Sequence, residues 1–279
     1  MADTWLITGA NSGFGKLMTE ALLARGNRVA ALVRTPATLE AIAAGDHEGR
    51  LIPLRLDLTD DATIDSAVDR AFAELGRIDV VVSNAGYGTF GAIEELSPTQ
   101  IRRQLETNLI GTMLFIRAVL PHLRRQGGGR IVQVSSEGGR IAYPGFSTYH
   151  ASKWGQEGFV EAVAKEVEPF GIEMSLVEPG PTGTNFLSGV DMGDPLPDYA
   201  ASPVAGLRDA LKHGGFDVTY GDPALIARAI IALAEAPKMP LRVPLGSVAW
   251  ENISKEAHAR LALLATQRGA AYACDEGAG

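Results

Sequence analysis

The chain has 279 residues, of which 46% are hydrophobic and 21% charged, and its formal net charge is −8. This composition indicates a globular protein with a sizeable core, and its acidic balance argues against binding a nucleic-acid backbone. A single cysteine, Cys274, excludes an internal disulfide and a thiolate-rich metal site. The N-terminus lacks a signal-peptide pattern and no apolar run has the length of a membrane span, so we expect a cytoplasmic protein without a membrane partner.

In chain order, short apolar runs alternate with longer amphipathic segments. The runs are rich in Val, Ile and Leu, which is typical of strands buried on both faces of a parallel sheet. The predicted strands are Trp5–Thr8, Arg28–Val33, Leu51–Leu56, Ile78–Ser83, Arg130–Ser135, Ile172–Val177 and a stretch near 240–245. The predicted helices lie near 14–25, 60–75, 98–125, 149–168, 223–235 and 247–267. The alternation predicts one α/β domain over residues 1–279: a Rossmann fold whose doubly wound parallel sheet has about seven strands, with helices on both faces.

Helix ends carry their own signals. Ser97 is followed by Pro and then by Gln100 at the third helical position, which predicts a capping box. Gly76 and Gly171 are predicted helix stops.

Between about 181 and 222, Pro and Gly residues interrupt the alternation of strands and helices. We expect this inserted segment to form a lid or substrate-binding loop.

A glycine-rich loop follows directly after the first predicted strand. Glycines at such a place permit a tight turn, close approach of a pyrophosphate and close packing of helix on strand. The N-terminus of the following helix offers free N–H groups to the phosphates. The loop residues expected to bind a dinucleotide are Gly9, Asn11, Ser12, Gly13, Phe14 and Gly15.

The end of the second strand indicates which dinucleotide is bound. An acidic residue there would bind the adenosine 2′-hydroxyl and repel a 2′-phosphate. Val33 occupies that place and Arg34 follows it. Because a guanidinium binds phosphate through paired donors, this favours NADP(H). If Arg34 is instead only a solvated surface residue, NAD(H) remains an alternative.

Further motifs follow in a fixed order. They are Asp57-Leu58, Ser83-Asn84-Ala85-Gly86, Ser136, Tyr149-His150-Ala151-Ser152-Lys153, Pro179-Gly180 and Thr184. In order and spacing they resemble the short-chain dehydrogenase/reductase family, in its classical branch, over roughly residues 3–185 and more weakly to about 268. The chain departs from the family at Ser83, where the family has Asn, and at Thr182, where it often has an aliphatic residue.

The resemblance implies a set of cofactor contacts beyond the glycine loop. These contacts are Asp57, Leu58, Asn84, Ala85, Gly86, Tyr149, Lys153, Pro179, Gly180, Thr182 and Thr184. It also implies that the helices near 98–125 and 149–168 pack against a second copy of the chain, in a homodimer or homotetramer.

The chemistry of carbonyl reduction points to the same residues. A phenol has a pKa of about 10, and a neighbouring ammonium lowers it by favouring the phenolate. Tyr149 and Lys153 are four residues apart and share one face of a helix. Ser136 follows a strand, where its hydroxyl can bind the substrate oxygen. By resemblance, Asn108 is the helix asparagine that supports a water-linked proton relay to the lysine; otherwise it is a helix-kink or core residue.

These observations predict an NADP(H)-dependent enzyme that interconverts a ketone or aldehyde and an alcohol. The expected substrate pocket, from 138–146, Tyr87, Phe90 and the 181–220 stretch, is largely apolar and favours a medium-sized apolar substrate, although Arg140 leaves a carboxylate-bearing one open. The alternatives are an NAD(H)-dependent dehydrogenase, an epimerase or dehydratase of the same fold, and a catalytically silent dinucleotide sensor. The histidines lack metal-ligand spacing, so we expect no metal.

Overall fold

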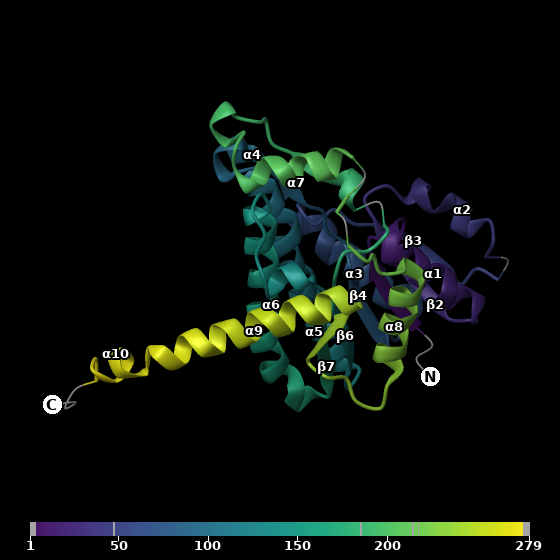
Figure 1. Cartoon of the computed structure of the whole chain (residues 1–279). Coiled ribbons are helices and arrows are strands. Elements are labelled where there is room, and N and C mark those ends of the chain that lie inside the picture. The colour runs from purple at the N-terminus through teal and green to yellow at the C-terminus, as the bar shows by residue number, and fades with distance from the viewer. Residues whose placement is uncertain (1–3, 47, 185, 214, 217, 276–279) are drawn as a thin grey trace.

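The computed structural model describes residues 4–46, 48–184, 186–213, 215–216 and 218–275. In this part of the chain the main sheet is parallel throughout, with strand order β3-β2-β1-β4-β6-β7-β9 (Figure 1). Its strands are β1 (Thr4–Thr8), β2 (Arg28–Val33), β3 (Leu51–Arg55), β4 (Val80–Ser83), β6 (Gly129–Val134), β7 (Ile172–Pro179) and β9 (Arg242–Leu245). The predicted strands are confirmed to within one or two residues at their ends, and so is the predicted Rossmann fold.

Helices cover both faces of the sheet because the strands alternate buried side chains to either side. Leu6 and Ile7, neighbours in β1, are fully buried in two different core clusters. One cluster packs the sheet against α3 (Asp61–Leu75), α5 (Gly111–Arg125) and α6 (Ser147–Val167). The other packs it against α1 (Gly13–Ala24) and α8 (Pro223–Glu235).

The predicted helix ends are confirmed. The hydroxyl of Ser97 accepts a hydrogen bond from the N–H of Gln100 at 3.2 Å, and the Gln100 side chain accepts from the N–H of Ser97 at 3.0 Å. This is the capping box expected from the sequence. Gly76 and Gly171 end their helices with φ angles of 75° and 70°, a backbone conformation that favours glycine.

The helix predicted over residues 98–125 is not continuous. It consists of α4 (Pro98–Leu105), a π-helical segment (Glu106–Ile110) and α5. The long-range contacts of this region explain the break. The side chain of Asn108 hydrogen-bonds the main chain of Tyr87, in the loop after β4. A Cβ at Gly111 would overlap the main chain of Leu58, so the helix packs closely there. A π segment of this kind often marks a functional site.

The structure contains short elements that the sequence analysis did not define, and two of them, β8 and α7, lie in the segment predicted as a lid. The short elements are α2 (Glu40–Ala43), β5 (Thr89–Phe90), β8 (Asp191–Met192), α7 (Pro203–Lys212) and α10 (Arg268–Tyr272). Strand β8 pairs with β5, and α7 packs its buried Val204 against an aromatic cluster that contains Phe90 and Phe146.

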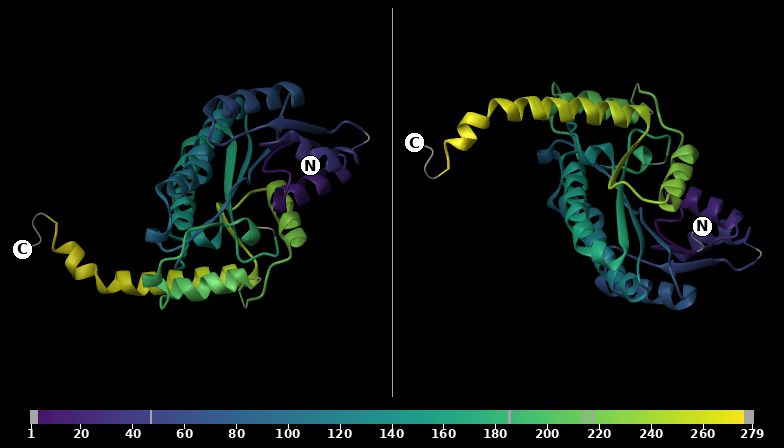
Figure 2. Two further views of the ribbon diagram at one scale, coloured as in Figure 1. Left: turned by 90° about the horizontal axis from the view of Figure 1, so that it is seen from above. Right: turned by 90° about the horizontal axis from the view of Figure 1, so that it is seen from below.

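The last long helix, α9 (Ser247–Thr266), begins beside the sheet and runs out from the body of the molecule (Figure 1, yellow; Figure 2). From residue 257 onward, every described residue of α9 and α10 is exposed. None of the described helices is long and apolar enough to cross a membrane.

Candidate active site

A cleft of about 1320 Å³ lies at the carboxyl ends of the strands. The chain leaves β1 toward β2 and β3 and returns to β4 on the other side, and a ligand site is expected at such a reversal. Most of the predicted site residues line this cleft. They are Gly9, Asn11, Ser12, Gly13, Phe14, Arg34, Asp57, Leu58, Asn84, Ala85, Gly86, Ser136, Tyr149, Lys153, Pro179, Gly180, Thr182 and Thr184. Gly15 and Asn108 do not line the cleft but lie behind it.

The glycine loop has the shape that a dinucleotide phosphate requires. Gly9 and Gly13 have φ angles of 67° and 50°. A Cβ at Gly15 would lie 2.7 Å from Nδ2 of Asn84 and closer still to the carbonyl oxygen of Gly9, so helix and strand approach too closely for a side chain. Ser12 caps α1 through its backbone conformation, and its side chain makes no capping hydrogen bond. The first N–H groups of α1 therefore remain available to an anion.

Asn84 joins the ends of the two strands on either side of the reversal. Its main-chain N–H donates to the hydroxyl of Thr8 at 2.9 Å, and its side-chain amide donates to the main-chain oxygen of Thr8 at 2.9 Å. The N–H of Ala85 binds the same hydroxyl at 3.0 Å. These contacts fix the floor of the cleft between β1 and β4.

The ends of β2 and β3 provide the charged groups on one wall. Val33 is buried, whereas Arg34 is exposed at the cleft and is unpaired among the described residues. Hydrogen bonds from the main chain and hydroxyl of Thr59 hold the pKa of Asp57 below its ordinary value, and Arg34 acts in the same direction. Asp57 is thus an anion beside a free guanidinium.

Ser136 and Tyr149 meet in the middle of the cleft. The Ser136 hydroxyl accepts from the N–H of Gly138 at 3.0 Å and donates to the main-chain oxygen of Pro179 at 3.5 Å. Tyr149 is 9% exposed. Burial raises the pKa of Tyr149 to about 12, and a hydrogen bond with Ser136 acts in the opposite direction. The phenol is therefore protonated at neutral pH, and the lowering of its pKa by a neighbouring ammonium that the sequence predicts is not found, because burial outweighs it.

Lys153 lies one turn along α6 from Tyr149, as the spacing predicts. Its Nζ is 5.8 Å from the centre of the Tyr149 ring. The ammonium donates to the main-chain oxygen of Val134 at 3.0 Å and to Oε1 of Gln156 at 3.2 Å. Burial lowers the pKa of Lys153 to about 7, so small changes in its surroundings alter its charge near neutral pH.

The Asn108 side chain holds the loop that follows β4. Its Oδ1 accepts from the N–H of Tyr87 at 3.1 Å, and its Nδ2 donates to the main-chain oxygen of Tyr87 at 2.8 Å. A Cβ at Gly86 would lie 3.3 Å from Oδ1 of Asn108, so the loop packs closely on this amide. Asn108 is fully buried and does not line the cleft, so it acts on the site through the residues that it holds in place.

The loop after β7 forms the opposite wall. The N–H of Gly180 donates to the main-chain oxygen of Leu245 at 3.1 Å, and the hydroxyl of Thr182 donates to the oxygen of Gly180 at 2.9 Å. Thr182 also pairs with Gly221 as an isolated parallel bridge. This bridge closes the base of the 181–222 segment, which brings its side chains over the cleft.

The outer part of the cleft is mainly apolar. Its apolar lining comes largely from the 181–222 segment and includes Phe146, Phe186, Leu187, Leu207, Phe216, Val218 and Val248. Of the residues expected here from the sequence, Gly138, Tyr143, Phe146 and Tyr87 line the cleft. Gly139, Arg140, Ile141 and Phe90 do not line it. Phe90 is part of the core under α7, and Arg140 binds Glu178 at 3.2 Å.

A polar group at the edge of the cleft was not predicted. Glu137 accepts from the Tyr143 hydroxyl at 3.1 Å and from the Asn252 side chain at 3.2 Å. Burial raises the pKa of Glu137. Because Asn252 is on α9, far along the chain, no local sequence pattern indicated this contact.

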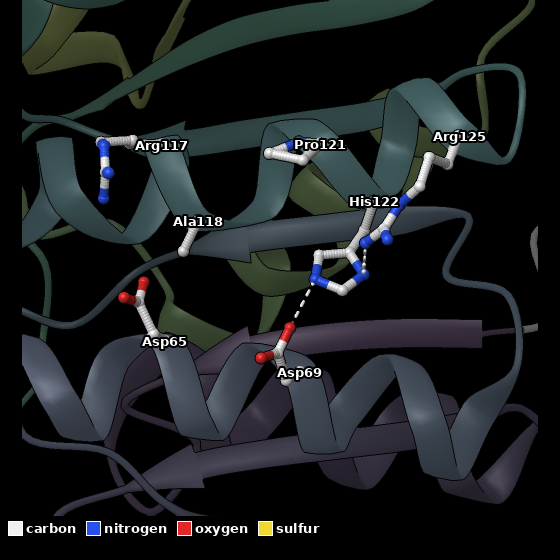
Figure 3. Close-up of a pocket in the computed structure, with 7 residues that line it drawn as sticks. All are labelled: Asp65, Asp69, Arg117, Ala118, Pro121, His122 and Arg125. Atoms are coloured by element: carbon white, nitrogen blue, oxygen red, sulfur yellow. Dashed lines mark hydrogen bonds and ion pairs between the residues drawn. The ribbon is translucent and has the colours of Figure 1, made fainter.

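A second, smaller hollow of about 360 Å³ lies between α3 and α5 (Figure 3). The ring of His122 contacts Asp69 at 2.8 Å and Arg125 at 2.8 Å there. Its lining residues and those of the cleft do not overlap. None of the predicted site residues lines this smaller hollow.

Comparison with known proteins gives the same family as the site residues. A family model described as short chain dehydrogenase matches residues 3–193. The oxidoreductase BOA17 from Botryotinia fuckeliana is 37% identical over 259 residues, which cover 92% of this chain and 93% of that protein.

Solved structures agree with this match. A short-chain dehydrogenase from Streptomyces avermitilis superposes with a TM-score of 0.89 at 35% identity and covers 99% of both chains. A short chain dehydrogenase from Burkholderia cenocepacia, in complex with NADP, superposes with a TM-score of 0.74 at 26% identity, over 95% of this chain and 97% of that one. With its parallel sheet, glycine loop and Ser-Tyr-Lys cleft, this chain belongs to the short-chain dehydrogenase/reductase family of oxidoreductases.

Proposed function

We propose that the protein is an NADP(H)-dependent reductase or dehydrogenase that interconverts a ketone or aldehyde and an alcohol on a medium-sized apolar substrate. One observation carries the proposal: Ser136, Tyr149 and Lys153 line the same cleft as the glycine loop, although they come from separate parts of the chain. A dinucleotide in this cleft would supply or accept a hydride at the substrate carbon.

The residues of the cleft fit such a cofactor. The glycine loop and the N-terminus of α1 would hold the pyrophosphate, and Asp57 with Leu58 would contact the adenine side. Arg34 supports the choice of NADP(H), because its free guanidinium can pair with a 2′-phosphate. The NADP complex of the Burkholderia cenocepacia relative is consistent with this choice.

The protein's own groups would manage the proton. In the reducing direction, the Tyr149 hydroxyl donates a proton to the carbonyl oxygen while the Ser136 hydroxyl hydrogen-bonds the same oxygen. Lys153, when charged, stabilises the phenolate that Tyr149 leaves behind. Asn108 supports the Ser-Tyr-Lys residues from behind the cleft, because its side chain ties the π segment to the main chain of Tyr87.

The 181–222 segment supports the proposed substrate class. Its aromatic and aliphatic side chains line the outer cleft, and we assign it the role of a substrate-binding lid. Phe186 lies 5.5 Å from Tyr149 between ring centres, so an apolar substrate would be held directly against the proton donor. Glu137, Tyr143 and Asn252 give the pocket one polar edge.

The test is dinucleotide consumption with a panel of apolar ketones and aldehydes, with NADPH and NADH in parallel. Turnover that favours NADPH is the expected result. Turnover with NADH alone would keep the reaction and remove the assigned role of Arg34. NADPH binding without turnover on any substrate would support the alternative of a silent dinucleotide sensor.

We also propose that the protein is a homo-oligomer. The support is the projecting part of α9, where Leu261, Leu263 and Leu264 are 66%, 60% and 63% exposed. Trp154 on α6 is 38% exposed and lies against the guanidinium of Arg260. Light scattering on the purified protein tests this assembly, and a monomeric mass would contradict it. The cytoplasmic location expected from the sequence stays a prediction.

A further inference from the structure

Gln156 connects Lys153 to the π segment. It lies one turn beyond Lys153 on α6 and is fully buried. Its Oε1 accepts from Nζ of Lys153 at 3.2 Å. Its Nε2 donates to the Thr112 hydroxyl at 3.2 Å and to the main-chain oxygen of Asn108.

The contacts of Gln156 allow one orientation of its amide. An ammonium only donates hydrogen bonds, so Lys153 requires the amide oxygen. A main-chain carbonyl only accepts them, so Asn108 requires the amide nitrogen. A flipped amide would place its N–H groups against the ammonium and its oxygen against a carbonyl oxygen. The two partners therefore fix each other's position through Gln156.

We propose that Gln156 is a positioning residue for Lys153, which supplies a fixed acceptor to the buried ammonium and ties it to the main chain at Asn108. The inference rests on the proposed function, because Lys153 is the lysine of the proposed site. With Val134, Gln156 occupies two of the three ammonium protons, which leaves the third for the cleft.

The charged neighbours of Lys153 have other partners. Glu157, which follows Gln156 on α6, accepts hydrogen bonds from the Ser135 hydroxyl and from the Arg242 guanidinium. Glu137, at the turn after β6, binds Tyr143 and Asn252. The titratable group that faces Lys153 is Tyr149. In the described part of the chain, the ammonium is thus held by two neutral oxygens, and the loss of either acceptor destabilises its charged form.

The bridge also changes the part that Asn108 plays. A carboxamide keeps its protons near neutral pH, so Gln156 orders Lys153 without passing a proton along. In this proposal, Asn108 acts through its main-chain oxygen and its hold on Tyr87. The water-linked relay implied by the resemblance does not run through this contact.

The experiment is an NMR titration of the cofactor-free protein with ¹³C-labelled lysine. The Lys153→Arg variant identifies the Lys153 signal by its loss, and the wild-type midpoint is expected at about 7. Gln156→Met keeps the length of the side chain and removes the acceptor. We expect its Lys153 midpoint to fall by about one pH unit, because the charged form loses a hydrogen bond.

Gln104→Met is the matched control. Gln104 is also fully buried and donates to the main-chain oxygen of Tyr87 at 3.1 Å, without touching Lys153. An unchanged midpoint in Gln156→Met, or an equal shift in Gln104→Met, would overturn the proposal. If Gln156→Met does not fold, Gln156→Asn shortens the reach and keeps an amide, and the same downward shift is expected.

The titration does not depend on turnover. A wild-type protein that reduces no ketone would therefore count against the proposed function and leave the midpoint comparison intact. In an active enzyme, the pH profile of kcat should shift in the same direction in Gln156→Met, and the Kd of NADPH at a pH below both midpoints should stay unchanged.

Discussion

The glycine-loop side of the cleft and its lid side are held in place by different kinds of contact. On the glycine-loop side, main-chain groups dominate: Gly9 donates its N–H to the oxygen of Leu32 at 2.8 Å, and Asn84 binds Thr8. On the lid side, side chains dominate. Arg208 of α7 is paired with the buried Glu95 and lies over the ring of Phe90, 5.5 Å from its centre.

This difference predicts that the two sides respond differently to substitutions that add volume and to substitutions that remove a charged pair. A site fixed by main-chain contacts tolerates little added volume but depends little on any one charged pair. A segment fixed by a few buried side chains depends strongly on each of them, and it can adapt its lining without altering the sheet. The comparison thus separates the proposed cofactor site from the proposed substrate site.

Tyr149 lies where the two sides meet, and its loss should have the largest effect. In Tyr149→Phe we expect turnover to fall by about 10³-fold, because the proposed proton donor is removed. The ring is kept, so its contact with Phe186 and the binding of NADPH should persist. Steady-state kinetics together with a dinucleotide titration check both points. Substantial remaining turnover would show that another group donates the proton.

Removal of the buried ion pair should loosen the lid side alone. Arg208→Met leaves the Glu95 carboxylate buried without its cation, which we expect to cost about 3 kcal/mol of lid stability. Hydrogen exchange should increase in α7 and stay unchanged in β1, and the KM for the ketone should rise while NADPH binding is kept. Lys16→Met, which removes a half-exposed pair with Glu20, is the control with little effect. Equal loosening of β1 would contradict the comparison.

The same ion pair sets an acid limit for the lid. Burial would raise the pKa of Glu95, but the N–H groups of Leu196 and Ala92 together with Arg208 hold it below the ordinary 4.5. Because the folded-state pKa is lowered, the contribution to stability is complete above about 4.5 and is lost as the pH falls through the lower folded value. Protection of the lid amides, obtained by correcting their exchange rates for the intrinsic pH dependence of amide exchange, should therefore fall only in that acid range.

Added volume should damage the glycine-loop side. In Gly15→Ala the new methyl group would press on the Gly9 carbonyl and on Asn84, so we expect NADPH to bind about 100-fold more weakly. In α7 on the lid side, a Cβ at Gly206 would meet nothing within 4 Å. Gly206→Ala should therefore keep NADPH binding and raise helix stability by about 1 kcal/mol. Similar NADPH affinities for the two variants would argue against the difference between the two sides.

The smallest expected effect concerns the choice of cofactor. Arg34→Ala should weaken NADPH binding about tenfold, because a charge-assisted contact to the 2′-phosphate is lost, and NADH binding should hardly change. Arg55→Ala is the control, since Arg55 is also near Asp57 but does not line the cleft. If NADPH and NADH lose affinity equally, Arg34 does not select the cofactor.

The sequence alone determined the seven strands of the main sheet, the glycine loop, the spacing of Tyr149 and Lys153, and the helix ends at Ser97, Gly76 and Gly171. These features are set within a few residues of the chain, where periodicity, turn chemistry and helix geometry act directly. The order of the motifs along the chain then placed Ser136, Asn84 and Arg34 at the same edge of the sheet, because the carboxyl ends of parallel strands meet there.

Only the tertiary structure decided the π segment, the Gln156 bridge, the contact of Glu137 with Asn252 and the tie between Arg208 and Glu95. Each of these features joins groups from distant parts of the chain. Gln156 and Lys153 are close in sequence, but Gln156 also binds Asn108 and Thr112, which lie far away in the sequence. A buried polar side chain takes whatever partner the packing brings to it, because an unpaired buried group is costly. That partner is chosen by the folded chain, and no periodicity in the sequence records it.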